Sequence, residues 1–412
     1  MSTLAINAGS SSLKFGLFKD DTFERVLTGD IDWAGGNRQQ AQLTVRPRDG
    51  IIVRSRLSVP DDATAAGCAI QAVVGATPAA GNGTMTITAV GHRVVHGGVE
   101  FRASVLIDEK VKGRIARLCS LAPLHNPPAL RGIEAAEAAL PAIPQVAVFD
   151  TAFYTRLPPK TSFYPVPYDW FQQWGVRRFG FHGISHGYCA CRAAELLGQE
   201  LGKLRLVSCH LGGGCSATAI QGGVAVATTG GFTPLEGLMM GTRCGSIDPG
   251  ILLELQRQPG LTPKELDRAL NHCSGLLGVS GVSADLAQIE VAAAQGNKRA
   301  RLAFDMFAEE VRSSVGALAT AMGGLDALIF TDRIGEQSTA LRSAVCDGLQ
   351  FIGLRLDPER NLKARPDADI AMKDSSARIL VIHSQEELVL AQEARRVADQ
   401  SAARLPMENA CV

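Results

Sequence analysis

Short apolar runs alternate with turns through the first part of the chain. The runs are "LAINAG", "LKFGLF", "AQLTVRP" and "IIVRSRLSV", and this pattern predicts short β-strands. Later stretches have the spacing of an amphipathic helix. One is "ALRGIEAAEAAL", whose end is marked by Pro141 and Pro144. Strands and helices mixed along one chain predict an α/β fold.

The opening pattern recurs in the second half. From Arg205 the sequence "LRLVSCHLGGGCSATAIQGGVAVATT" gives an apolar run, a small-residue turn, a second run, another turn and a third run. Residues 3–30 follow the same plan. The recurrence predicts a duplicated α/β architecture of two lobes with a cleft between them.

Three further segments carry clear expectations. The stretch "NKRARLAFDMFAEEVRSSVGALATAMGG" predicts a long helix that stops at paired glycines. "LDALIFTDRIGEQS" predicts a buried strand that leads into a glycine-containing turn. The last helix opens with Ser384 and Glu387, which have the spacing of a capping box.

Composition excludes several classes of protein. The 412 residues include 41 Lys and Arg and 41 Asp and Glu, so the basic excess of a nucleic-acid binder is missing. No apolar run approaches the roughly 18 residues of a membrane span, and the N-terminus does not resemble a signal peptide. The ten cysteines are scattered, which is typical of reduced thiols. We therefore expect a cytoplasmic protein that binds neither nucleic acid nor membrane.

Two turns are unusually rich in small residues. "NAGSSSLK" and "HLGGG" would let the backbone approach an anion closely and direct N–H groups at it. Each alone is equally compatible with a tight hairpin turn. Their corresponding places in the two halves favour phosphate binding. Neither is a Walker A or a Rossmann motif.

Two histidine pairs have the i, i+4 spacing of helical zinc ligands. His92 and His96 fall in "VGHRVVHGG", which predicts a strand, where residues four apart lie roughly 13 Å from each other. His182 and His186 fall in "HGISH", whose glycine and isoleucine do not favour a helical turn. The sequence therefore argues against zinc.

Three charged residues are better candidates for a site. Arg93 follows a strand, and Arg243 lies in the Gly-rich segment "MMGTRCGSIDPG". A guanidinium in such a loop suits phosphate or carboxylate recognition. Asp150 ends the buried run "VAVFD", where a carboxylate can bind a metal, a base or an arginine. Local ion pairs are the alternative interpretation for all three.

Several long motifs occur in the order typical of one family. They are "INAGSSSLKF", "GHRVVHGG", "LAPLHNPP", "FDTAFY", "RFGFHGISH", "HLGGG", "GGFTPLEGLMMGTRCGSIDPG" and "GLRLDPERN". Together they resemble the acetate kinase family, from Ala5 to about Ala398. The resemblance implies the duplicated two-lobe actin-like ATPase fold of acetate and sugar kinases, with the active-site cleft between lobes. Residues 1–150 plus 385–412 would form the acyl and phosphate lobe, and 151–384 the nucleotide lobe.

The resemblance also implies a function and its residues. The reaction is reversible, Mg²⁺-dependent phosphoryl transfer between ATP and acetate, giving acetyl phosphate and ADP, by a homodimer. Arg93, Asp150, His182 and Arg243 resemble the catalytic residues. The substrate-binding residues would be Arg93, Val95, Leu124, Phe181 and Pro234. Asn7 and Glu386 would be associated with Mg²⁺. The nucleotide-binding residues would be Lys14, His210, Leu211, Gly212, Gly213, Gly214, Asp285, Leu286, Ala287, Asp332, Arg333, Ile334, Gly335 and Glu336.

The sequence departs from the family pattern mainly on the nucleotide side. Asp332 and Arg333 replace a glycine pair, Gly213 stands where asparagine is common, and Ala287 replaces an arginine. "GTRCGSIDPG" also has Cys244 and Ser246 where the family commonly has Ser and Asp. Arg333 could fill the adenosine pocket, reach a phosphate in place of the lost arginine, or point outward and leave ATP binding unchanged.

Alternative functions follow from these departures. The chain could be a propionate or other short-chain acyl kinase, or an acetate kinase that uses pyrophosphate and phosphate. A sugar kinase of the same fold is another alternative, although its hydroxyl substrate would need a general base. A non-catalytic actin-like scaffold is the alternative from a different class.

Overall fold

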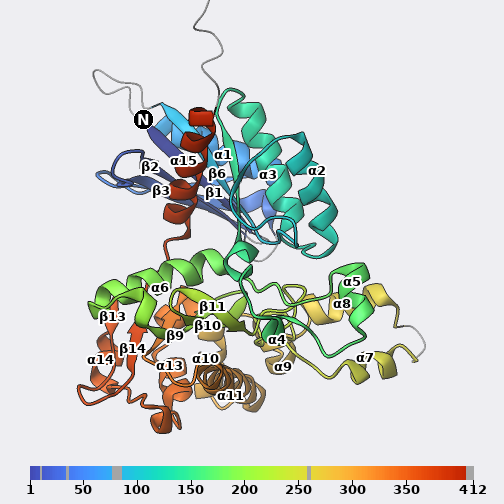
Figure 1. The fold of residues 1–412 in the computed structure, drawn as a ribbon, viewed down its shortest axis with the longest axis vertical. Helices are drawn as coiled ribbons and strands as arrows, with labels where there is room; N and C mark the ends of the chain where they lie inside the picture. The colour runs from blue at the N-terminus through green and yellow to red at the C-terminus, as the bar shows by residue number, and fades with distance from the viewer. Residues whose placement is uncertain (10–11, 34–36, 77–85, 258–260, 405–412) are drawn as a thin grey trace, which may run out of the picture. The chain divides into compact units, whose positions relative to one another are not determined.

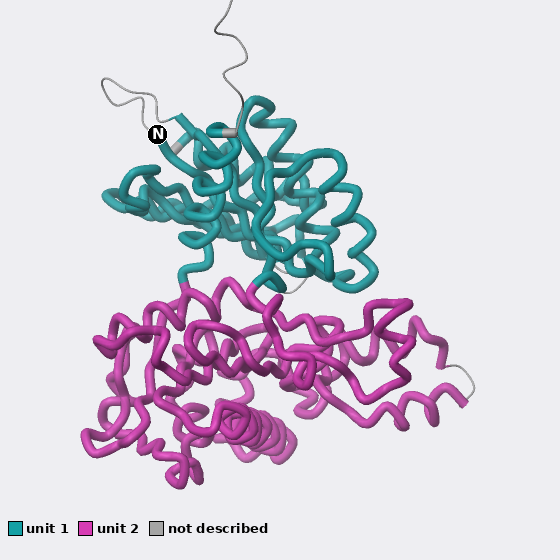
Figure 2. The backbone as a smooth tube through the Cα atoms, in the orientation of Figure 1, with its two compact units in different colours: residues 1–152, 385–412 teal, residues 153–384 magenta. Residues whose placement is uncertain are grey.

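The computed structural model describes residues 1–9, 12–33, 37–76, 86–257 and 261–404, apart from the side chain of residue 404. The described chain divides into two compact units (Figure 2). Unit 1 comprises Met1–Ala152 and Gln385–Val412, and unit 2 comprises Phe153–Ser384.

Unit 1 is built on one sheet with the strand order β5-β4-β3-β2-β1-β6-β8-β7 (Figure 1). Its strands are β1 (Ser2–Ala8), β2 (Ser12–Lys19), β3 (Arg25–Asp32), β4 (Ala41–Pro47), β5 (Val53–Leu57), β6 (Ile87–Val94), β7 (Val105–Leu106) and β8 (Gln145–Phe149). Its helices are α1 (Asp62–Ala76), α2 (Glu109–Arg117), α3 (Asn126–Ala139) and α15 (Glu386–Arg404).

Unit 2 has a sheet with the order β11-β10-β9-β12-β14-β13. The strands are β9 (Arg205–Leu211), β10 (Cys215–Gln221), β11 (Val224–Thr228), β12 (Ala327–Thr331), β13 (Ala368–Asp369) and β14 (Arg378–Val381). The helices are α4 (Pro159–Ser162), α5 (Tyr168–Trp174), α6 (Gly183–Leu197), α7 (Pro249–Leu255), α8 (Pro263–His272), α9 (Gly275–Ser280), α10 (Leu286–Ala294), α11 (Lys298–Ala321), α12 (Asp332–Gln337), α13 (Thr339–Cys346) and α14 (Pro358–Lys363).

The two sheets share a five-strand plan. In unit 1, β3-β2-β1 is antiparallel, and β6 and β8 continue the sheet parallel to β1. In unit 2, β11-β10-β9 is antiparallel, and β12 and β14 continue it parallel to β9. The internal duplication predicted from the small-residue turns is therefore present in the topology.

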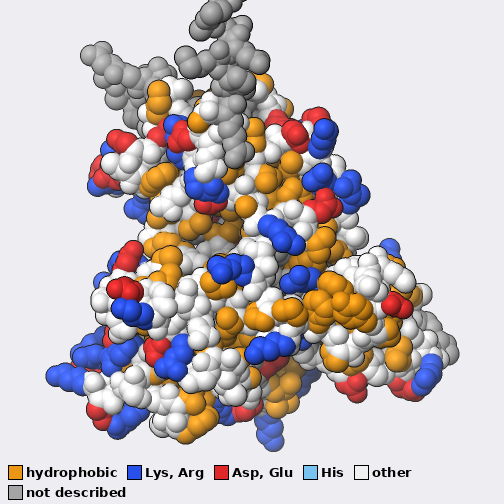
Figure 3. Space-filling view, viewed as in Figure 1, with side chains coloured by type: hydrophobic (Ala, Val, Ile, Leu, Met, Phe, Trp, Pro, Cys, Tyr) orange, Lys and Arg blue, Asp and Glu red, His pale blue; other side chains and the backbone are white. Residues whose placement is uncertain are grey.

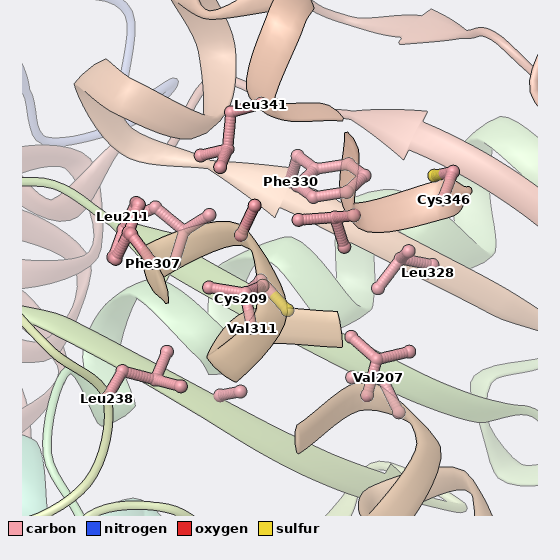
Figure 4. Packing of buried hydrophobic residues seen from close by; sticks show 14 of the residues in the cluster. Val207, Cys209, Leu211, Leu238, Phe307, Val311, Leu328, Phe330, Leu341 and Cys346 are labelled. Atoms are coloured by element: carbon pink, nitrogen blue, oxygen red, sulfur yellow. The ribbon is translucent and has the colours of Figure 1, made fainter. Parts of the chain in front are cut away.

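Each sheet is held by apolar packing. The largest core, in unit 2, joins one face of the sheet to α11 and α13 through residues such as Val207, Phe307, Val311 and Phe330 (Figure 4). These four side chains are fully buried, and a large buried apolar side chain typically contributes about 1.5–3 kcal/mol to folding. This packing fixes the strand ends from which the functional loops leave.

Three local expectations were wrong. "HGISH" begins a helix, since α6 starts at Gly183, directly after His182 adopts a left-handed conformation. "DRIGEQ" is not a turn but the short helix α12. The capping box at Ser384 does not form: α15 starts at Glu386, and the buried Ser384 hydroxyl makes no hydrogen bond within the described residues.

Membrane association finds no structural support in the helices. Among the described residues, none of the helices is long and apolar enough to cross a bilayer. On the face shown in Figure 3, basic and acidic side chains are interspersed, as the balanced composition predicts.

Candidate functional site

The first group of candidate residues, in unit 1, centres on Arg93. β6 and β8 run parallel and adjacent, with Arg93 opposite Val148, so Arg93 and Asp150 leave the same edge of the sheet. Arg93 donates from Nε and Nη2 to Oδ2 of Asp150, at 3.0 and 2.8 Å. Asp150 is fully buried. Burial opposes the charge on Arg93, but the carboxylates of Asp150 and Glu386 outweigh it and raise the pKa of the guanidinium.

Asn7 and Glu386 complete this group. Asn7 lies near the end of β1, the strand beside β6, and donates from Nδ2 to Oε2 of Glu386 at 2.9 Å. Arg93 Nη1 lies 3.3 Å from both Asn7 Oδ1 and Glu386 Oε2. Gly91 lets α15 pack this closely, because a Cβ there would lie 2.5 Å from the Leu390 carbonyl oxygen. Glu387 Oε1 also accepts from Asn7 Nδ2 at 3.4 Å, so unit 1 gathers one guanidinium, one amide and three carboxylates.

Val95 and Leu124, the predicted apolar substrate residues of unit 1, lie near a pair of hydrogen bonds between His96 and Asn126. His96 N donates to Asn126 Oδ1, and Asn126 Nδ2 donates to the His96 carbonyl, both at 3.0 Å. This bond ties the segment of Val95, which is buried, to the segment of Leu124, which is half-buried. Asn126 was missed as a candidate, although its motif "LAPLHNPP" had been noticed.

Lys14 lies on β2 opposite Asn7 on β1 and Asp30 on β3, and its side chain is exposed. Of the predicted phosphate turn "NAGSSSLK", residues 10 and 11 lie outside the described residues. Gly9 donates from its N–H to the carbonyl of Ser12 at 2.8 Å, which closes the turn between the two strands.

The second group, in unit 2, begins with a chain of hydrogen bonds behind His182. His182 Nδ1 lies 2.8 Å from Ser216 Oγ, which lies 2.9 Å from His186 Nε2. His186 Nδ1 in turn meets Ser208 Oγ at 2.8 Å. Burial, and then the charge of His210, hold the pKa of His186 well below its usual 6.5, so His186 is neutral at pH 7. These hydrogen bonds orient the His182 ring. Sequence reasoning did not identify Ser216 or His186 as part of this hydrogen-bonded group.

Arg243 and His182 converge on Gly214. A Cβ on Gly214 would lie 2.7 Å from Arg243 Nη2 and 3.3 Å from His182 Nε2, so glycine is needed there. Arg243 Nη1 donates to the carbonyl of Pro234 at 2.7 Å. The guanidinium is held in place by backbone, and burial lowers its pKa. Phe181, the residue before His182, is buried and accepts a bond from Tyr154 Oη.

The loop His210–Gly214 follows β9. The His210 ring stacks on His182, with centroids 4.2 Å apart and planes 14° apart. His210 Nδ1 lies 2.9 Å from Ser185 Oγ, and Nε2 lies 3.3 Å from Oδ2 of Asp332. The predicted catalytic histidine and the predicted phosphate loop therefore lie together in unit 2.

The remaining candidates lie on α10 and α12. Asp285 caps α10 by accepting from Ala287 N at 3.0 Å, and it also pairs with Arg333 Nη1 at 3.2 Å. Arg333 is half exposed and its guanidinium faces Asp285, itself a predicted nucleotide-binding residue, so which of the three expectations for Arg333 holds stays a prediction. The guanidinium of Arg333 therefore contacts the N-terminal end of α10. Ala287, which replaces the family arginine, lies in the first turn of this helix. Leu286, Ile334 and Gly335 are buried.

A buried arginine that sequence reasoning missed anchors α12. Arg342 donates from Nη1 to the carbonyls of Gly335 and Glu336, at 2.9 and 2.8 Å, and from Nε to Asn361 Oδ1 at 2.7 Å. Asn361 belongs to the motif "GLRLDPERN", so that motif supports α12. Glu336 also pairs with His383 Nδ1 at 2.9 Å.

Zinc chemistry finds no support in the geometry. Within the described ranges, three or more His, Cys, Asp or Glu side chains nowhere gather in a way that could hold a metal ion. His92 is buried against Gln145, with Nε2 at 2.8 Å from Oε1. Burial lowers the pKa of His92 to about 4, although the bond to Gln145 opposes this.

Comparison with known proteins supports the resemblance. The model of the acetokinase family matches residues 2–392. The acetate kinase of Nostoc sp. is 47% identical over 403 residues, covering 95% of this chain and 98% of the relative. The solved acetate kinase of Porphyromonas gingivalis has a TM-score of 0.84 and 38% identity, with 96% of this chain and 99% of that chain covered.

A propionate kinase of Francisella tularensis subsp. tularensis is similar as well, with a TM-score of 0.86, 34% identity and the same coverage of 96% and 99%. These likenesses confirm the predicted α/β fold over nearly the whole chain. The chain belongs to the acetokinase family.

Proposed function

We propose that this protein catalyses phosphoryl transfer between ATP and acetate, giving acetyl phosphate and ADP, and the reverse reaction. The observation that carries the proposal is the Arg93 group of unit 1, found in a member of the acetokinase family. A guanidinium fixed by a buried carboxylate is a ready-made receptor for a second carboxylate. In this proposal unit 1 holds the acyl substrate and unit 2 the nucleotide.

Acetate needs no general base. Its pKa is about 4, near those of Asp and Glu, so it is ionised at pH 7 and its oxygen can attack phosphorus directly. The difficulty is the approach of two anions and the charge that spreads over the phosphoryl oxygens. In this proposal Arg93 donates to the acetate carboxylate, while Asp150 keeps the guanidinium in position and takes no proton.

Unit 2 supplies the groups for the phosphoryl oxygens. Arg243 Nη2 and His182 Nε2 are directed at Gly214, where no side chain intervenes. Both can donate to an oxygen, and Ser216 holds the His182 ring from the opposite nitrogen. Preorganised donors of this kind commonly contribute 10²–10³-fold each to the rate, about 3–4 kcal/mol.

Mg²⁺ fits the oxygen donors of unit 1. Asn7 Oδ1 and the Glu386 carboxylate are hard ligands, and Mg²⁺ is usually held by one or two carboxylates together with water and substrate phosphates. When bound with the nucleotide, Mg²⁺ would neutralise phosphate charge.

Within unit 1, the apolar residues that contact the acyl chain in this proposal are Val95 and Leu124. One methylene changes binding by only about 1–3 kcal/mol, so propionate is the competing substrate, as the Francisella tularensis relative suggests. We further propose that the enzyme is a cytoplasmic homodimer.

The test is hydroxylamine trapping. The protein is incubated with ATP, Mg²⁺ and acetate, propionate or a sugar, and acyl hydroxamate is measured. We expect acetohydroxamate that disappears when EDTA removes Mg²⁺. A sugar phosphate without hydroxamate would indicate a sugar kinase, and no turnover with any acceptor would indicate a non-catalytic scaffold.

A further inference from the structure

Asp332 has a backbone conformation that side chains rarely adopt. Its φ is +61°, and within the described part of the chain the other non-glycine residues with positive φ are Phe23 and His182. Aspartate tolerates this region because its short side chain can bond locally, but the conformation still costs about 1–2 kcal/mol. The surrounding structure therefore holds Asp332 in this place.

The side chain of Asp332 lies against the loop that follows β9. Its Oδ2 is 3.3 Å from His210 Nε2, and a Cβ on Gly212 would overlap the carboxylate. The Asp332 side chain is 28% exposed and that of His210 only 8%, so water screens the pair incompletely. The carboxylate of Asp332 thus already lies against the surface of the loop His210–Gly214.

This contact also fixes the His210 ring. Nε2 of His210 faces Oδ2 of Asp332 across 3.3 Å, and Nδ1 meets Ser185 Oγ at 2.9 Å. Both ring nitrogens therefore have polar neighbours, and a phosphate arriving at the loop meets the Asp332 carboxylate.

Anchoring of α12 keeps the carboxylate there. Arg342 holds the far end of the helix through the Gly335 and Glu336 carbonyls, and Arg333 holds its first turn through Asp285. A small displacement of Asp332 away from the loop would need one of these contacts to give way. The helix that carries Asp332 is therefore anchored at both ends.

We propose that the Asp332 carboxylate competes with the phosphate groups of the nucleotide for the loop His210–Gly214. The proposal rests on the proposed function, which assigns nucleotide binding to this loop. Two like charges a few ångströms apart repel by several kcal/mol at an effective dielectric constant near 20, less where water screens them. Asp332 thereby weakens binding of ADP and ATP while leaving the adenosine moiety unaffected.

The experiment measures binding by calorimetry of ADP, inorganic pyrophosphate and adenosine to the full chain. The variants are Asp332→Asn, which removes the charge but keeps a residue that tolerates positive φ, and Asp332→Gly, which also removes the side chain. Asp347→Asn, at the exposed end of α13, is the matched charge control. We expect both Asp332 variants to bind ADP and pyrophosphate about tenfold more tightly, with adenosine unchanged.

Four results would overturn the proposal: unchanged or weaker ADP binding in both Asp332 variants, no ADP binding by any variant, an equal gain for adenosine, or the same gain in Asp347→Asn. A gain in Asp332→Gly alone would show that bulk and not charge matters, and would also overturn it. The proposed function is tested separately by the hydroxylamine assay, where its failure appears as absence of hydroxamate from ATP and acetate. Calorimetry can still test the role of Asp332 in that case, because binding needs no turnover.

Discussion

Arg93 meets Asp150 through two nitrogens that bind the same carboxylate oxygen, Nε at 3.0 Å and Nη2 at 2.8 Å. The third nitrogen, Nη1, is shared between Asn7 and Glu386. The aspartate therefore fixes the plane of the guanidinium. In the proposed reaction this makes Asp150 a positioning residue.

Replacing Asp150 by asparagine tests that role. The amide can still accept from Arg93, so the fold is expected to survive, but the charge that holds the guanidinium is lost. We expect kcat for acetyl phosphate formation to fall about 10²–10³-fold. The pH–rate profile should stay flat between about pH 6 and 8, since no proton transfer is lost. A new pH-dependent limb in the variant would show that Asp150 acts as a base.

Gly214 offers a steric test with a neighbour as control. The added Cβ of Gly214→Ala would lie 2.7 Å from Arg243 Nη2 and displace both that group and His182. We expect a loss of kcat of about 10²-fold with little change in thermal stability. Gly213→Ala has nothing within 4 Å of the new Cβ, so its loss should be at least about tenfold smaller. Equal losses would contradict the convergence of Arg243 and His182 on this position.

Arg333→Gly tests the outward conformation of this arginine. The Arg333–Asp285 pair is half exposed, so breaking it should change the free energy of unfolding by less than about 1 kcal/mol. We expect acetyl phosphate consumption with ADP in both proteins and none with orthophosphate. The KM for ADP should change by less than about threefold, which corresponds to under 1 kcal/mol.

The alternative for Arg333 has a distinct signature. Poor use of ADP by the wild type, acceptance of orthophosphate and recovery of ADP use in Arg333→Gly would show that this arginine closes the adenosine pocket. Such a protein would make pyrophosphate. The comparison is best made in one assay with both acceptors side by side.

His92 predicts a pH dependence of stability. Burial lowers its pKa from the usual 6.5 to about 4, so the unfolded chain takes up the proton first. Stability is complete above pH 6.5 and is lost as the pH falls toward 4, by about 2 kcal/mol at pH 5. Urea unfolding at pH 7 and pH 5 should show this loss, and His92→Gln should reduce it by that amount. An unchanged slope in the variant would contradict the assignment.

The sequence alone determined the classes of element and their repetition. The apolar runs "LKFGLF" and "AQLTVRP", each bounded by turn residues, were enough to predict β2 and β4. The small-residue turns at Gly9 and at Gly212 exposed the duplication, which the matching strand orders of the two sheets confirm. Motif order identified the family, and the comparisons confirm it.

Tertiary structure decided which side chains meet. Arg93 and Glu386 are 293 positions apart in the sequence, and they come together because Gly91 lets α15 lie directly on β6. Helix α12 is held by the buried Arg342, and the left-handed Asp332 opposes His210 because β12 lies beside β9. The helix or strand propensity of a local segment carries no information on such contacts. Packing between distant segments supplies the free energy that holds a strained residue or a buried charge in place.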